Sequence, residues 1–368
     1  MLLSGDFARQ DFALGRAMTE SLIEATAERL FGDHCTPRLL AAAEKGAFAA
    51  DFWAAVEEAG LPRALVPEEA GGFGMPVAEA LTILRVAGRH AVPLPLGETI
   101  AASWLLAGAG LALPDGPLTI APVGKDAALA LERRGDAWHL SGSASRVPWG
   151  RDAVAVAVLA THQGVPMVAC VARGGFTVAH GSNLAREPRD TLDFDASLGA
   201  DAVAPAASGV DHASLRALGA AMRSLQMAGA MAGLLDMTTK YALDRTQFGK
   251  PIGKFQAIQH SLAILGAHQA AAGAAATGGA EAVGDGLRVF PIAVAKLRTG
   301  EAAGLCAGLA HQVHGAIGFT YEHSLHFLTK RLLSWRNEFG NEAEWGLMLG
   351  RHLAAAGADR LWHEITAA

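Results

Sequence analysis

The chain has 368 residues and a mass of 38.0 kDa, and its 30 basic and 36 acidic side chains give a formal charge of −6. Because 51% of the residues are hydrophobic and 18% are charged, the chain can bury a large core, which excludes wholesale disorder. The mild acidity argues against nucleic acid as the main partner, since phosphate binding needs a concentrated basic surface. The length favours two or three packed units.

Three further features predict a soluble cytoplasmic protein. No apolar run reaches the roughly 18 residues that span a bilayer, so we expect no membrane span. The first residues of the chain carry charges too early for a signal peptide. Cys35, Cys170 and Cys306 are far apart and form no CxxC pair, which fits a reducing compartment.

The first part of the chain, to about residue 112, is predicted to be helical. Phe48, Phe52 and Val56 recur at roughly helical spacing. A turn-rich stretch over residues 67–72 interrupts the pattern, and helical periodicity resumes from Val77 onward.

The character of the sequence changes near Pro114. Short alternating or β-rich segments follow, among them Leu118–Ile120, Ala128–Leu131 and Met167–Val171, with glycine, proline or charged turns between them. Their spacing predicts a compact, mostly antiparallel sheet domain of roughly 95 residues that ends near Pro205.

From Asp211 to the end the sequence is helical again. Leu215, Leu218 and Met222 trace an apolar stripe at the spacing of a helix inside a bundle. The stretch Gly266–Gly286 contains two glycine clusters, and it predicts a helix end followed by a loop.

The three parts together predict an α+β fold. Its predicted domains are an N-terminal helical domain (1–112), a small middle β-sheet domain (113–207) and a C-terminal helical bundle (208–368). No GxGxxG or Walker phosphate loop is present, which disfavours a nicotinamide-binding Rossmann fold. No Ser/His/Asp or Cys/His arrangement can be identified by spacing, so a covalent mechanism has no support.

One corner between two long apolar helices has an unusual composition. The segment Arg245–Gln259 carries three basic residues, two glycines and three glutamines. Arginine offers a planar donor fork suited to phosphate, and glycine lets a ligand approach the backbone closely. The alternative is an ordinary helix–loop–helix corner with a solvated arginine, which the pattern alone favours.

A second segment, His311–His326, contains four histidines and raises the question of a metal site. His311 and His314 are three residues apart and could share a helix face. No third and fourth ligand follows at a recognised spacing, so surface or packing histidines are the favoured interpretation and we predict no metal. Gly315 and Gly318 mark a turn where backbone amides could face a ligand.

Glu338 is the candidate catalytic residue, because it is a carboxylate flanked by bulky apolar residues. Burial would raise its pKa, as a general base working near neutrality requires. The alternative is a structural glutamate paired with Arg336 or Lys330.

Taken together, the two segments resemble the acyl-CoA dehydrogenase family. The family's Arg–x–x–Phe–Gly–x–x–Ile–x–x–Phe–Gln–x–x–Gln run is matched without a gap by Arg245, Phe248, Gly249, Ile252, Phe255, Gln256 and Gln259. Its Gln–x–x–Gly–Gly–x–Gly–Phe run is matched by Gln312, Gly315, Ala316, Gly318 and Phe319, with alanine in place of the second glycine. The resemblance covers essentially the whole chain.

The resemblance implies an FAD cofactor bound between the sheet domain and the C-terminal helices, near a subunit interface. Arg245 and Phe248 match positions that contact the pyrophosphate and adenosine part of the FAD, usually that of a neighbouring subunit, and Gln256 belongs to the same motif. The family positions that hold the other end of this pyrophosphate and adenosine part are matched by Gln312, Gly315 and Ala316. An arginine and backbone amides would then meet the phosphates.

The reaction implied by the resemblance is the α,β-dehydrogenation of an acyl-CoA thioester to the 2-enoyl-CoA. A glutamate removes the α-proton, and a hydride passes from the β-carbon to the flavin. Electrons then commonly pass to an electron-transferring flavoprotein. The implied assembly is a homo- or hetero-oligomer such as a dimer of dimers.

The sequence departs from the family at the expected positions of the base. Counting from Gln312 without gaps places Phe339 where the family's base lies, with Glu338 one residue earlier. Some members carry the base on the long helix before the arginine motif, and there this chain has Gly219. On a helix, a shift of one residue turns a side chain by about 100°.

The sequence also departs where the family holds the flavin ring. The family's Thr–Glu–Pro–Gly loop becomes Ile120–Gly124, and its Trp–x–Thr pair becomes Arg146 and Pro148. The ring half of the site therefore looks degraded, while the adenine half looks intact.

Three hypotheses remain open. The first is an FAD-dependent acyl-CoA dehydrogenase with Glu338 as base. The second is a non-catalytic subunit that completes the FAD site of a catalytic partner in a heteromer, as in bacterial heterotetrameric relatives that act on steroid or other bulky acyl-CoAs. The third is a flavin-free relative that only binds an acyl-CoA or acts structurally. The intact arginine motif argues against the third.

Overall fold

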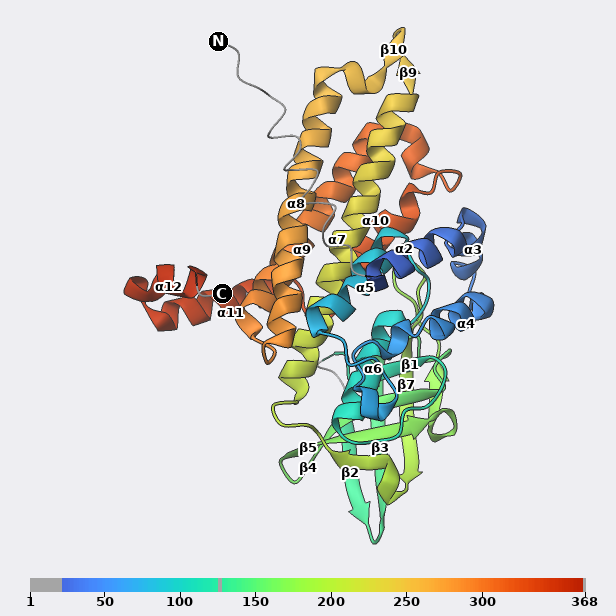
Figure 1. The fold of residues 1–368 in the computed structure, drawn as a ribbon, viewed down its shortest axis with the longest axis vertical. Helices are drawn as coiled ribbons and strands as arrows, with labels where there is room; N and C mark the ends of the chain where they lie inside the picture. The colour runs from blue at the N-terminus through green and yellow to red at the C-terminus, as the bar shows by residue number, and fades with distance from the viewer. Residues whose placement is uncertain (1–21, 125–127, 367–368) are drawn as a thin grey trace.

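The computed structural model describes residues 22–124 and 128–366, in the predicted order of helices, sheets and helices (Figure 1). The first residues, whose charges argued against a signal peptide, lie outside these ranges. Five α-helices are described before the sheets: α2 (Leu22–His34), α3 (Pro37–Ala43), α4 (Ala50–Glu58), α5 (Val77–Arg89) and α6 (Leu96–Gly108). Local sequence sets the start of α3, because Thr36 accepts a hydrogen bond from the Leu39 N–H and Pro37 occupies the first helical position.

The middle of the described chain forms two four-stranded sheets. One has the order β1-β4-β5-β8 and consists of β1 (Leu118–Ala121), β4 (Ala155–His162), β5 (Val165–Ala172) and β8 (Val203–Pro205). The other has the order β2-β3-β7-β6 and consists of β2 (Ala128–Arg134), β3 (Ala137–Pro148), β7 (Arg189–Leu198) and β6 (Phe176–Ala179). All pairs are antiparallel except β1 with β4, which confirms the mostly antiparallel prediction.

The C-terminal part is built around α7 (His212–Asp244), which packs against helices on several sides. The other helices are α8 (Gln256–Gly284), α9 (Val289–His314), α10 (Leu325–Trp335), α11 (Glu342–Ala356) and the short α12 (Leu361–Thr366). Asp211 and Ser214 form a reciprocal capping box at the start of α7. A Cβ on Gly229 would lie 1.7 Å from the Arg85 carbonyl oxygen, so glycine is needed where α5 crosses α7.

The prediction of a helix end and loop within Gly266–Gly286 is wrong for all but the last residues of this stretch. The helix α8 continues to Gly284, because Ala272, Ala276 and Ala280 lie on a buried face that packs on neighbouring helices. A Cβ at Gly279 would lie 2.8 Å from the Cβ of Ala295 on α9. The glycine therefore permits close helix packing here and does not break the helix.

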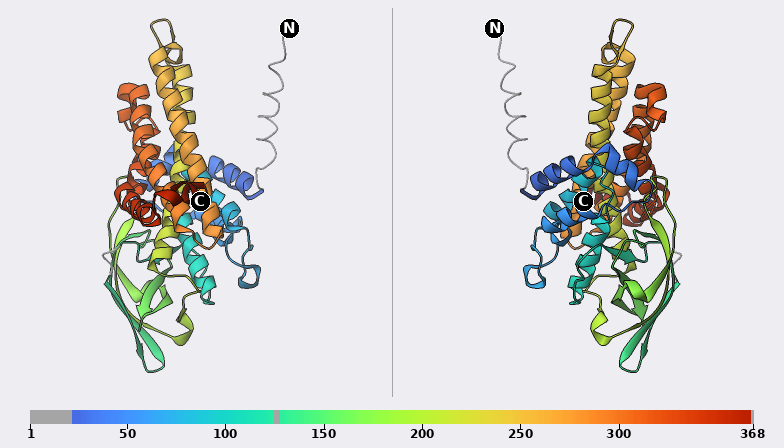
Figure 2. Two further views of the ribbon diagram at one scale, coloured as in Figure 1. Left: turned by 90° about the vertical axis from the view of Figure 1, so that its left-hand side faces the viewer. Right: turned by 90° about the vertical axis from the view of Figure 1, so that its right-hand side faces the viewer.

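The long helices separate two regions of interest. A small hairpin, β9 (Thr246–Gln247) with β10 (Lys250–Pro251), joins α7 to α8 at one end of the molecule. The two sheets lie at the opposite end of the long axis, and the rotated views agree (Figures 1 and 2). Within residues 22–124 and 128–366, no helix combines the length and apolar character needed to cross a bilayer.

Candidate functional site

A cleft of about 880 Å³ lies between the sheet domain, the first turn of α7 and the segment that joins α10 to α11. The residues that the resemblance assigns to the flavin-ring loops contribute to one wall, namely Pro122, Val123, Gly124 and Arg146. The opposite wall includes Glu338 and Phe339. The structure therefore brings together the positions at which the sequence departs from the family.

Glu338 is held between two arginines in this cleft. Its Oε1 accepts a hydrogen bond of 2.7 Å from Arg189 Nε, and its Oε2 accepts one of 2.7 Å from Arg223 Nε and one of 3.1 Å from Arg189 Nη2. Burial alone would raise the pKa of Glu338, but the charges and hydrogen bonds of Arg189 and Arg223 outweigh burial and lower this pKa to about 2. The raised pKa expected from the sequence is therefore not found, and the partners are neither Arg336 nor Lys330.

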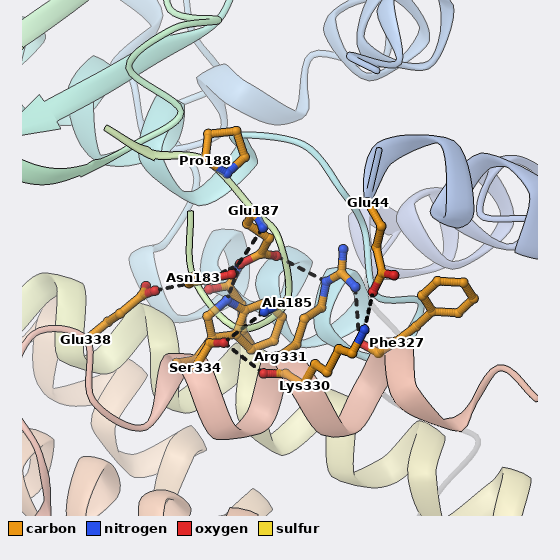
Figure 3. A network of polar contacts seen from close by, with 12 residues as sticks. Glu44, Asn183, Ala185, Glu187, Pro188, Phe327, Lys330, Arg331, Ser334 and Glu338 are labelled. Carbon is orange, nitrogen blue, oxygen red and sulfur yellow. Dashed lines mark hydrogen bonds and ion pairs between the residues drawn. The ribbon is translucent and has the colours of Figure 1, made fainter. Parts of the chain in front are cut away.

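The two arginines belong to a larger buried ionic network with equal numbers of positive and negative groups. Its members are Glu98, Glu187, Glu338, Arg189, Arg223 and Arg331. Glu187 is 3.0 Å from Arg189 and 3.1 Å from Arg331, and it accepts a hydrogen bond of 3.0 Å from the Trp335 indole. Figure 3 shows Glu187 directed toward Arg331 on α10 and Glu338 directed toward Asn183. The network joins α6, the start of β7 and the segment before it, α7, α10 and the segment after α10, so it links all three parts of the fold.

The network was not predicted from the sequence, although two of its three arginines gave a signal. Arg223 is a lone charge in the apolar stripe of α7, and Arg331 is a lone arginine among the buried side chains of α10. A single charge on an otherwise apolar helix face needs a buried partner of opposite sign. The identity of that partner depends on long-range packing, which the pattern does not give.

Phe339 occupies the place where a base was expected. Its side chain is 7% exposed, its φ of 55° lies in the left-handed region, and its carbonyl accepts a hydrogen bond of 3.0 Å from the Trp345 indole. The ring lies so close to Gly219 that a Cβ there would be 2.2 Å from a ring carbon. The two positions at which the resemblance places a base are therefore in direct contact, and neither carries a titratable side chain.

A buried lysine fixes the segment that carries Glu338 and Phe339. Lys296 on α9 is 1% exposed, and its Nζ donates hydrogen bonds to the carbonyl oxygens of Arg336 (2.7 Å) and Gly340 (2.8 Å). Burial lowers the pKa of Lys296 to about 7, although nearby carboxylates partly offset this effect. Both ends of the segment are thus bonded to one side chain.

The residues predicted for the adenine half of FAD lie in exposed positions near the far ends of the long helices. Arg245 follows α7, Phe248 lies between β9 and β10 with a 91% exposed side chain, and Gln256 begins α8. Gln312 lies in the last turn of α9, and Gly315 and Ala316 begin the 3₁₀ helix η6 (Gly315–Phe319). Gly315 has a φ of 62° and open space around its Cβ position. Exposed guanidinium, aromatic and backbone groups of this kind fit the phosphates and adenosine of a dinucleotide.

The histidines of His311–His326 pack against aromatic rings. The His314 ring is stacked on Tyr241 with centroids 4.4 Å apart, and the His311 ring is stacked on Phe319 at 4.7 Å. In the described ranges, no three His, Cys, Asp or Glu side chains are arranged to hold a metal ion.

Comparison with known proteins identifies the family of the chain. The family model described as "Acyl-CoA dehydrogenase, N-terminal domain" matches residues 18–111, and the model described as "Acyl-CoA dehydrogenase, C-terminal domain" matches residues 215–353. The chain belongs to the acyl-CoA dehydrogenase family.

Individual relatives agree with this assignment. The chain is 26% identical over 318 residues to acyl-CoA dehydrogenase IpdE2 of Mycolicibacterium smegmatis, covering 84% of this chain and 91% of that protein. It is 28% identical over 321 residues to IpdE2 of Mycobacterium tuberculosis, covering 84% and 89%. Among solved structures, a variant of the Tcur3481-Tcur3483 steroid ACAD aligns with a TM-score of 0.81 and 26% identity over 94% of this chain and 98% of that one. The ChsE4-ChsE5 complex from Mycobacterium tuberculosis shares the fold, with a TM-score of 0.82 and 23% identity over 92% and 99%.

Proposed function

We propose that this chain is the subunit of a heteromeric acyl-CoA dehydrogenase that completes the FAD site of a partner chain and does not itself remove the α-proton of the substrate. The observation that carries the proposal is the contact of Phe339 with Gly219. At the two positions where the family carries a glutamate base, this chain therefore has a phenylalanine and a glycine, and the two are in contact.

The surroundings of Glu338 argue against its predicted role as base. A general base works best with a pKa near the operating pH, whereas the pKa of Glu338 is lowered to about 2. Turning its carboxylate toward a substrate would leave Arg189 and Arg223 buried with fewer partners. Glu344 is the other carboxylate among the described residues of the cleft, and it lies 2.6 Å from Arg216.

The separation of the two half-sites supports a cofactor shared between chains. The first turn of α7 lines the cleft, and Arg245 follows the last turn of the same helix. A helix of 33 residues is about 50 Å long, which exceeds the length of an extended dinucleotide. One FAD therefore cannot contact both the cleft and the hairpin of a single chain, so the exposed adenine-half residues are free to serve a neighbour's FAD.

The relatives support a heteromer and a substrate class. The Tcur3481-Tcur3483 steroid ACAD is named for two chains and for steroid substrates. By analogy, the catalytic partner of this chain would oxidise an acyl-CoA with a bulky group such as a steroid. Bound FAD would supply the hydride acceptor, and the partner would supply the base. Arg245, Phe248, Gln256, Gln312, Gly315 and Ala316 of this chain would bind the phosphates and adenosine, which fixes the cofactor in place.

The experiment that tests the proposal is turnover of the assembly with Glu338 changed to Gln. The assembly is obtained by purifying a tagged chain from its own cells together with the partner that co-purifies, and it is assayed with steroid acyl-CoA substrates and an electron acceptor. We expect turnover per bound FAD to stay within about threefold of wild type, since no substrate proton is transferred to Glu338. The assay temperature is kept below the unfolding temperature of the variant. Loss of turnover with FAD retained would instead assign the base to Glu338.

A further inference from the structure

The two segments of the adenine half-site are joined through one tyrosine. The carbonyl oxygen of Tyr241 accepts the backbone N–H of Arg245 at 2.9 Å, so Tyr241 closes the last turn of α7 before the arginine corner. Its hydroxyl donates a hydrogen bond of 3.3 Å to the carbonyl oxygen of His314, the last residue of α9. Gly315 follows directly. Tyr241 thus bonds to both cofactor-binding segments, through its carbonyl to the backbone of Arg245 and through its hydroxyl to the residue before Gly315.

Stacking reinforces this connection. The Tyr241 ring lies nearly parallel to the His314 imidazole, with centroids 4.4 Å apart and an interplanar angle of 22°. His323, just before α10, contacts both rings, at 5.9 Å from Tyr241 and 4.6 Å from His314. The ends of α7 and α9 and the start of α10 therefore meet at one small aromatic cluster.

A hydrogen bond at one of its two ring nitrogens fixes the orientation of the His314 imidazole. Its Nδ1 is 2.8 Å from the Ala310 carbonyl oxygen, which makes Nδ1 the protonated nitrogen. Its side chain is 3% exposed, and its buried Nε2 has no hydrogen-bond partner within the described ranges. A buried acceptor without a hydrogen bond destabilises the fold, because its desolvation is not compensated. The stacking of the ring on Tyr241 is a favourable contact that offsets part of this cost.

We propose that Tyr241, acting with His314, is a positioning residue that holds Arg245 and the Gly315 turn at the separation the cofactor requires. This inference rests on the proposed function. Both segments are exposed helix ends, which fray unless something fixes them. A ligand that contacts two segments binds more tightly when their separation is set in advance, because less ordering is needed on binding.

The test measures FAD affinity in the purified assembly by flavin fluorescence, with three variants. Tyr241→Phe keeps the ring and removes the hydroxyl, and one lost hydrogen bond should weaken FAD binding by about threefold to tenfold. Tyr241→Leu also removes the stacking, and its loss should exceed about tenfold. Tyr321→Phe is the matched control, because Tyr321 is the other tyrosine of the chain and is 71% exposed.

Thermal unfolding of the same samples separates positioning from general stability. The expected result is a graded loss of FAD affinity at Tyr241, with the unfolding temperature of Tyr241→Phe within a few degrees of wild type and no change for Tyr321→Phe. Wild-type affinity in both Tyr241 variants would overturn the inference and leave the proposed function intact. A wild-type assembly that binds no FAD would overturn both.

Discussion

Replacing Glu338 by Gln removes the negative charge that two buried arginines share. Removing one partner of a buried ion pair typically costs about 3–5 kcal/mol, because the remaining charge stays buried. Arg189 keeps Glu187 and Arg223 keeps Glu98, so the lower end of this range, about 3 kcal/mol, is expected. For a chain of this length, that loss lowers the unfolding temperature by about 4 °C. Calorimetry at pH 7 measures it.

The pH dependence of stability tests the same interaction. The folded pKa of Glu338 is depressed from 4.5 to about 2, so its stabilising contribution is present above pH 4.5 and is lost as the pH falls toward 2. A shift of this size corresponds to roughly 3 kcal/mol, which is of the same order as the cost of the lost ion pair. The destabilisation in Glu338→Gln should therefore be smaller at pH 4 than at pH 7 by about 1 kcal/mol.

The control is Glu58→Gln, at the exposed end of α4, which should change the unfolding free energy by less than about 0.5 kcal/mol. If Glu338→Gln changed the unfolding free energy as little as this control does, Arg189 and Arg223 would not depend on the Glu338 carboxylate. The buried ion pairs would then not stabilise the fold, contrary to the prediction.

Three further predictions follow from the same structure. Gly219→Ala should destabilise the chain by about 1–3 kcal/mol because its Cβ would collide with the ring of Phe339. In a Phe339→Ala background that cost should disappear, and strictly additive losses in calorimetry would contradict the contact. Burial lowers the pKa of Lys296 to about 7, so between pH 7 and 10.5 the unfolded chain binds this proton more tightly than the folded chain does. The stability of the wild type should therefore rise across this window relative to Lys296→Met, by up to roughly 1.4 kcal/mol per pH unit. If the difference in unfolding free energy between wild type and Lys296→Met did not change with pH, the lowered pKa of Lys296 would be contradicted. Arg245→Ala should leave the unfolding temperature of the isolated chain unchanged, since Arg245 is exposed, yet weaken FAD binding in the assembly by about tenfold or more, as fluorescence titration would reveal.

Local sequence patterns predicted the architecture because each element carries its own signals. The stripe at Leu215, Leu218 and Met222 predicted the buried face of α7, and turn-rich stretches separated the strands. The same local rules failed at Gly266–Gly286, where glycine serves close packing between α8 and α9. The difference depends on the neighbouring helix, which a local pattern does not contain.

The candidate site was predictable only in part for a related reason. The sequence identified Glu338 as a carboxylate among apolar residues, but the sign of its pKa shift depends on Arg189 and Arg223, which are 149 and 115 positions away. Likewise, Gly219 and Phe339 each departed from the family at the sequence level, and only the fold brings them into contact. Long-range contacts between charges and rings decide what such residues can do.

The visible absorption spectrum of the chain, purified alone and again with its partner, shows whether this chain binds the flavin ring without help. FAD is quantified per subunit in both samples. We predict a colourless chain alone and a yellow assembly with about half an equivalent of FAD per subunit, because each cofactor needs one chain of each kind. A yellow isolated chain with close to one equivalent of FAD would contradict this prediction, since the flavin-ring half of the site would then function within this chain.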